Sequence, residues 1–270
     1  MEISALFPAL TAGMATWLAT AAGAAFVFAS INFSRRAMDI LMGFAAGVML
    51  AASCWCLLNH ALHLAAHTWW GAWHTIPVAL GVLLGAFVLD IMERYLPHAC
   101  LHEDEHPHDH EHGPRIPGNI LFMLAILLHN IPEGLALGVT FGAAIVSQDG
   151  GMLAGAVLLT AGICLHNIPV GMAMSLPMLK EGFSRRKAFL IGQGPGLVEP
   201  VMTVLGATVA ASVTSILPYA MSFAAGAMIY VVVAELIPQS DKSGNHRAAT
   251  AGLMVGFVLM MCLEHTLHTH

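Results

Sequence analysis

Two short phrases place metal-binding side chains inside long apolar segments. Residues 128–134 read LHNIPEG, and residues 165–171 read LHNIPVG. In the first phrase His129 and Glu133 are four residues apart, so on a helix they share one face. Imidazole nitrogens and carboxylate oxygens bind divalent zinc, iron, manganese and cobalt, and carboxamides add weaker oxygen ligands. The first phrase therefore predicts a metal-binding face that also includes Asn130.

The second phrase repeats this arrangement without its carboxylate. His166 and Asn167 match the first copy, but Val170 stands where the first copy has Glu133. A single histidine in an apolar helix is more often a hydrogen-bonded packing residue. Two matching phrases favour a metal site instead, although both asparagines also suit ordinary hydrogen bonds between membrane helices.

A third segment, GQGPGLVEP at 192–200, carries a further carboxylate. Glu199 lies within an apolar run, and the glycines and proline at 194–196 loosen the helix before it. Ionisable side chains inside a membrane are costly and face the protein interior or a water-filled cavity. Glu199 is therefore a third predicted contributor to the metal site.

Composition indicates how these segments are held. The 270 residues are 57% hydrophobic and only 10% charged, against roughly 25% charged residues in soluble domains. This predicts an all-α integral membrane protein, a single transmembrane domain over residues 1–270. A spanning helix needs roughly 20 apolar residues, and eight segments meet this requirement: 5–29, 38–62, 74–96, 118–146, 152–179, 186–212, 216–238 and 248–264.

The ten Lys and Arg residues all fall on one side of the membrane in this division. By the positive-inside rule that side is cytoplasmic, so both termini are expected outside the cytoplasm. The two phrases then lie near the middles of spans 4 and 5, which run in opposite directions. Prolines 132 and 169 are expected to break these helices. Matching broken helices that meet at the midplane are typical of transporters with inverted repeats.

Glycines recur at four-residue spacing in several spans and permit close helix packing in lipid. Between spans 3 and 4, the loop 97–117 is rich in histidine and acidic residues. Such a loop is expected to be disordered and to capture metal weakly. Its six histidines are His98, His102, His106, His108, His110 and His112.

At this point the sequence resembles the ZIP family of divalent-metal transporters, especially its bacterial branch. The matching pieces are HNIPEG, HNIPVG, GLVEP and, in span 7, FAAGAMIYVVVAELIP. The resemblance implies uptake of Zn2+, or of Fe2+, Mn2+, Co2+ or Cd2+, into the cytosol across the cell (inner) membrane. It implies a metal site made of six residues: His129, Asn130, Glu133, His166, Asn167 and Glu199.

The resemblance also implies inverted repeats of spans 1–3 and 6–8 around spans 4 and 5, an elevator-like movement and a homodimer. Glu235 matches a family residue near the inner exit. Bacterial relatives usually carry a carboxylate at Val170 that helps to bind a second metal, so we expect a single-metal site here. No catalytic residue, resident cofactor or nucleic-acid partner is expected.

Other polar residues in the spans are open to two interpretations. Asp90, near the cytoplasmic end of span 3, is either an exit-path residue or an interfacial charge. The histidines at 60, 63 and 67 form one stripe on span 2, which collects metal at the entrance or lies at the interface. Those at 265, 268 and 270 form a capture tail or are solvated.

Three alternative functions remain at the level of sequence. Val170 and the histidine-rich loop also suit a metal sensor or non-transporting relative, and histidine-rich loops occur in exporters. An intramembrane metalloprotease typically uses H-E-x-x-H, and neither of the two repeated phrases supplies a second histidine at that spacing.

Overall fold

The computed structural model describes residues 6–29, 34–66, 73–95, 118–147, 150–180, 182–212, 216–241 and 244–268. Within these ranges the backbone alone is described at 93–95, 118–126, 128–129, 180, 211 and 267–268. The described chain is helical and contains no strand. The all-α prediction is confirmed.

Eight helical segments are long and apolar enough to cross a membrane, as the sequence predicts. Span 1 is α1 Phe7–Ala24, followed by the short 3-10 segment η2 Ala25–Phe28. Span 2 consists of α2 Arg35–Ala52, the π-helical η3 Ser53–Asn59 and α3 His60–Ala66. Spans 3 and 4 are single helices, α4 Thr75–Tyr95 and α5 Gly118–Ser147. Spans 5 and 8 are single helices, α6 Gly150–Lys180 and α11 His246–His268. Span 6 consists of α7 Arg185–Gln193, the 3-10 turn η5 Gly194–Leu197 and α8 Val198–Ser212. Span 7 consists of α9 Leu217–Val231, the π-helical η7 Val232–Leu236 and α10 Ile237–Asp241.

The prediction of broken helices is wrong for spans 4 and 5. Helix α5 continues through Pro132, and α6 continues through Pro169 and Pro177. Proline removes one backbone donor and crowds the carbonyl one turn earlier, but the turns on either side keep the helix continuous. The expected break occurs in span 6 instead, where η5 separates α7 from α8.

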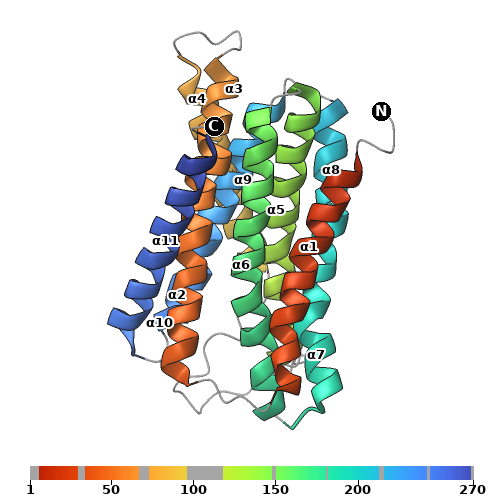
Figure 1. Cartoon of the computed structure of the whole chain (residues 1–270), viewed down its shortest axis with the longest axis vertical. Coiled ribbons are helices and arrows are strands. Elements are labelled where there is room, and N and C mark those ends of the chain that lie inside the picture. Colours follow the sequence, from red (N-terminus) through yellow and green to blue (C-terminus); the bar gives the residue numbers. More distant parts are fainter. Residues whose placement is uncertain are drawn as a thin grey trace.

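Small residues bring the helices together in four close pairs, α1 with α6, α5 with α8, α2 with α11, and α4 with α9 (Figure 1). A Cβ atom at Gly138 of α5 would overlap the carbonyl oxygen of Thr203 in α8. At Gly171 of α6 it would overlap the carbonyl oxygen of Thr20 in α1. Since lipid gives no hydrophobic drive for association, such close backbone contact is what stabilises the pairs.

The packing contacts repeat along the chain. Gly85 in α4 lies against the carbonyl of Phe223, and Gly256 in α11 lies against that of Phe44. Gly226 follows Gly47 in the sequence by the same number of residues as Phe223 follows Phe44. Both glycines lie against carbonyls, of Leu253 and Val82 respectively.

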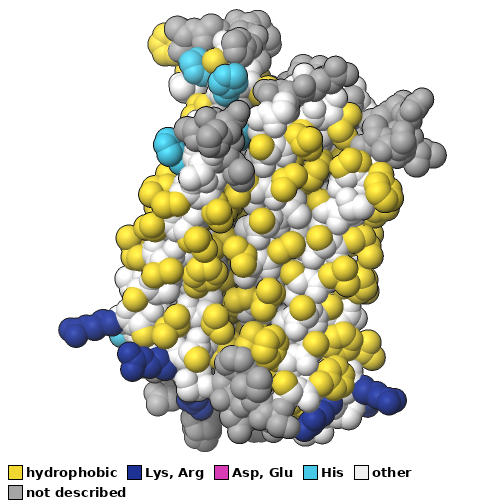
Figure 2. Space-filling view, viewed as in Figure 1, with side chains coloured by type: hydrophobic (Ala, Val, Ile, Leu, Met, Phe, Trp, Pro, Cys, Tyr) yellow, Lys and Arg dark blue, Asp and Glu magenta, His cyan; other side chains and the backbone are white. Residues whose placement is uncertain are grey.

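On the face shown in Figure 2, the exposed side chains between the two ends of the bundle are mainly apolar, as a lipid-facing surface requires. The described Lys and Arg side chains gather at one end, where α2, α7 and α11 begin. The histidines visible in this view lie mainly at the opposite end, where α1 begins and α11 finishes (Figures 1 and 2). This separation agrees with the charge segregation found in the sequence.

Candidate metal site

The five predicted site residues whose side chains are described all lie inside the bundle. Asn130 and Glu133 come from α5, His166 and Asn167 from α6, and Glu199 from the first turn of α8. None of these side chains is more than 1% exposed. Because burying polar groups in an apolar bundle is expensive, their gathering is a strong indication of a site.

The two phrases meet directly. Nε2 of His166 lies 3.2 Å from Oε1 of Glu133, so the histidine of the second phrase contacts the carboxylate of the first. The sequence placed Glu133 beside the polar groups of its own helix. The structure places it across an interface between α5 and α6, where an imidazole and a carboxylate can bind one ion together.

Asn167 holds the third carboxylate in place. Its Nδ2 lies 3.0 Å and 2.9 Å from the two carboxylate oxygens of Glu199 and donates to both. The same nitrogen donates to the backbone carbonyl of Thr16 in α1, at 3.0 Å. Asn167 thus connects spans 1, 5 and 6 at one point, and the α1 contact is not visible in the sequence.

Glycine packing brings the two glutamates to the same level of the bundle. Gly134 follows Glu133, and a Cβ atom built on it would lie 2.8 Å from the carbonyl oxygen of Glu199 and 3.2 Å from its Cα. A larger residue there would force α5 and α8 apart. The close approach of the two helices therefore places both carboxylates around one region of the interior.

Two amide atoms in this region remain available as ligands or donors. Nδ2 of Asn130 and Oδ1 of Asn167 are buried and have no hydrogen-bond partner among the described residues. A buried amide atom that bonds nothing in the protein is unusual, and an ion with its remaining water would satisfy such atoms. The donor set of imidazole, carboxylates and amide oxygen fits a divalent transition metal.

His129 lies on α5, but its side chain is outside the described residues. Among the side chains that are described, no group of three His, Cys, Asp or Glu residues has the geometry of a metal centre. Val170 is 5% exposed, so an apolar side chain fills the interior position that corresponds in the second phrase to Glu133 of the first.

The two exit-path candidates lie in spans that pack together. Asp90 of α4 accepts a hydrogen bond from the hydroxyl of Tyr230 in α9, at 3.3 Å. Glu235 lies within the π-helical segment η7 and is partly buried. π-Helical segments are rare and frequent at functional sites, which the sequence did not reveal here.

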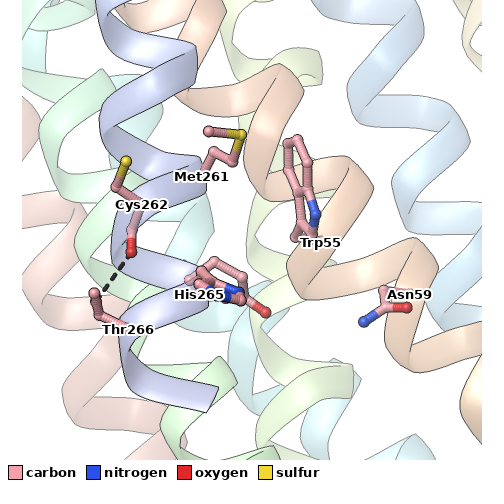
Figure 3. A pocket seen from close by; sticks show the side chains of 7 residues that line it. Trp55, Asn59, Met261, Cys262, His265 and Thr266 are labelled. Atoms are coloured by element: carbon pink, nitrogen blue, oxygen red, sulfur yellow. Dashed lines mark hydrogen bonds between the residues drawn. The ribbon is translucent and has the colours of Figure 1, made fainter. Parts of the chain in front are cut away.

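A pocket at the histidine-rich end contains residues that sequence reasoning missed. It has a volume of about 470 Å³ and lies between η3 and α11 (Figure 3). Glu264, only 4% exposed, contributes to its lining, and the thiol of Cys56 donates to Glu264 Oε2 at 3.4 Å. The available signal was an isolated glutamate near the end of an apolar span. His265 also lines this pocket. His63 lies on α3, four residues after the lining residue Asn59, and is exposed.

Several predicted elements fall outside the described residues. They are the loop 97–117 with its six histidines, the histidine at position 67 and the histidine at position 270. The capture roles expected for them stay predictions.

Fold and site together define a class, namely an all-helical membrane protein with eight spans and a buried cluster of imidazole, amide and carboxylate groups. A family model described as ZIP Zinc transporter matches residues 102–264. The chain belongs to this family. It is 37% identical to the zinc transporter ZIP11 of Homo sapiens, with 97% of each chain covered.

Bacterial relatives cover the chain equally well. The zinc transporter GufA of Myxococcus xanthus is 36% identical, with 96% of this chain and 98% of the relative covered. The zinc transporter ZIPB of Bordetella bronchiseptica is also 36% identical, with 96% and 81% covered. These relatives are named as transporters, and the chain is not an enzyme.

Proposed function

We propose that this protein imports a divalent transition metal, with zinc as the principal substrate, through the buried site on α5, α6 and α8. The observation that carries the proposal is the contact of His166 with Glu133, beside a Glu199 carboxylate held by Asn167. Relatives over nearly the full chain are named as zinc transporters. Iron, manganese, cobalt and cadmium suit the same donor set.

We propose that the site holds one ion at a time. Glu133 and Glu199 together carry two negative charges, which balance one divalent cation. A second ion would bring two further positive charges into a low-dielectric interior, and Val170 offers nothing to offset them. His129 and Asn130, on the same helix as Glu133, complete the proposed ligand set.

Import requires that the ion reach the site from one side and leave to the other. We assign the histidine-rich end to the outside of the cell membrane and the end with Lys and Arg to the cytoplasm. Both termini then lie outside the cytoplasm. On this assignment the pocket lined by Glu264 and His265 is the outer entrance, and Asp90 and Glu235 lie on the exit path.

The repeated packing contacts support inverted repeats of spans 1–3 and 6–8. The shift that relates Phe44 to Phe223 also relates Gly47 to Gly226, and each pair occupies the same role in packing. Two such halves around α5 and α6 offer two equivalent arrangements, one open to each side. An elevator-like movement and a homodimer complete the proposal.

Uptake of radioactive zinc into proteoliposomes tests the function. We expect saturable uptake by the wild-type protein, and at least tenfold slower uptake by His129→Ala and by Glu133→Gln. His246→Ala is the matched control, because this exposed histidine lies at the start of α11, away from the site. Competition by iron, manganese, cobalt and cadmium ranks the substrates.

The alternatives give different results. Zinc binding without flux would identify a sensor, and flux only from loaded vesicles outward in the native orientation would identify an exporter. Cleavage of membrane-embedded substrates would identify a protease. If His129→Ala transports like the wild-type protein, the proposed site is wrong.

A further inference from the structure

The break in span 6 decides where Glu199 lies. Helix α7 ends at Gln193, the 3-10 turn η5 covers Gly194–Leu197, and Glu199 is the second residue of α8. Two glycines and a proline make up most of this turn. Glycine permits many backbone conformations, so the turn sequence alone does not fix the position of Glu199. Other contacts must do so.

Trp17 of α1 supplies such contacts at the start and in the middle of the turn. Its Nε1 donates to Oε1 of Gln193 at 2.8 Å. A Cβ atom on Gly196 would lie 3.1 Å from Cδ1 of Trp17 and 3.3 Å from Thr20. The indole therefore bonds the last residue of α7 and packs directly on the glycine that precedes Glu199 by three positions.

The location of Trp17 argues against the usual role of tryptophan in membranes. Tryptophan is enriched at the two interfaces, but Trp17 lies in the middle of the span Phe7–Phe28. An indole N–H at that depth needs a protein partner, because lipid offers none. Gln193 is the partner, and its side chain is only 9% exposed.

The neighbouring residue of α1 holds Glu199 from the other direction. The carbonyl of Thr16 accepts a hydrogen bond from Asn167, which also donates to both Glu199 oxygens. Thr16 thus restrains the Glu199 carboxylate through Asn167. The adjacent Trp17 restrains the turn that precedes Glu199 through Gln193. A movement of the turn relative to α1 would alter the geometry between Glu199 and Asn167.

We propose that Trp17 and Gln193 are positioning residues for the metal site, and that their hydrogen bond holds the span 6 turn so that Glu199 can bind the ion. Neither side chain touches the ion on this proposal, which rests on the proposed function. They position Glu199, which binds a divalent cation together with Glu133 and His166.

A double-mutant cycle on the full-length protein tests the pair. Zinc affinity is measured by calorimetry for the wild-type protein, Trp17→Phe, Gln193→Leu and the double variant. All four carry serine in place of the six histidines of the loop 97–117, so that loop binding does not contribute. Trp73→Phe is the matched control, because this indole is 68% exposed.

We expect each single variant to bind zinc about tenfold more weakly, the effect of losing a buried hydrogen bond. The double variant should bind zinc no more weakly than the single variant with the lower affinity, because both changes remove the same hydrogen bond. Gln193→Leu breaks that bond from the other side and serves alone if Trp17→Phe does not fold. Uptake should show a raised KM.

Three results would overturn the inference. The first is wild-type affinity in both single variants, and the second is a double-variant loss equal to the product of the single losses. The third is reduced thermal stability with unchanged affinity, which would make the pair structural only. Glu199→Ala separates this from the wider proposal, because zinc affinity retained in that variant would overturn the metal site itself.

Discussion

Replacement of Val170 with glutamate tests whether one missing carboxylate sets the number of bound ions. Val170 occupies the position of Glu133 in the second phrase, four residues after His166, so a carboxylate there would project from the helix face that carries His166. The site would then contain three carboxylates. We expect the variant to bind two zinc ions where the wild-type protein binds one.

The structure sets the size of the effect. The Val170 side chain is 5% exposed, and close packing of Gly171 on α1 leaves α6 no room to shift toward α1. Added volume in a packed core costs about 1–3 kcal/mol, and an uncompensated buried polar group costs about 1–3 kcal/mol or more. The metal-free variant should therefore lose about 2–6 kcal/mol, a large part of a typical stability of roughly 5–15 kcal/mol.

Zinc should restore much of this stability. A ligand present at about 100 times its Kd stabilises the folded state by about 2.7 kcal/mol, and the variant gains this contribution from one more site than the wild-type protein. The matched control is Val170→Gln, which adds nearly the same volume without the charge. It should be destabilised in the absence of metal and should still bind one ion.

The assay combines metal content by mass spectrometry with thermal unfolding with and without zinc. Both are run with serine in place of the histidines of the loop 97–117, so that only the buried site is counted. Two ions in the wild-type protein at full occupancy would refute the reasoning. So would a single ion in Val170→Glu together with unchanged affinity.

Three further changes probe other parts of the structure. Asn167→Ala removes the donor to both Glu199 oxygens, so zinc affinity should fall at least tenfold in calorimetry; unchanged affinity would exclude a positioning role. Gly138→Ala should destabilise the α5–α8 pair by about 1–3 kcal/mol in thermal unfolding, whereas Gly150→Ala, with no neighbour within 4 Å, should have little effect. Glu264→Gln should slow uptake at low zinc and leave the saturated rate unchanged; equal slowing at all concentrations would contradict an entrance role.

The membrane architecture could be predicted because it depends on local properties. Hydrophobic length and the distribution of Lys and Arg are readable residue by residue, and all eight spans were found in this way. The effect of proline was overestimated at Pro132 and Pro169. A proline weakens a helix locally, but the helical turns on either side keep α5 and α6 continuous.

The sequence by itself determined the kinds of side chain at the site and the spans that carry them. Only the tertiary structure decided which groups meet, because contacts such as Glu133 with His166, or Trp17 with Gln193, join positions far apart in the chain. Those contacts depend on which helix faces pack together. Small residues allow that packing, but the choice of partner helix belongs to the whole bundle.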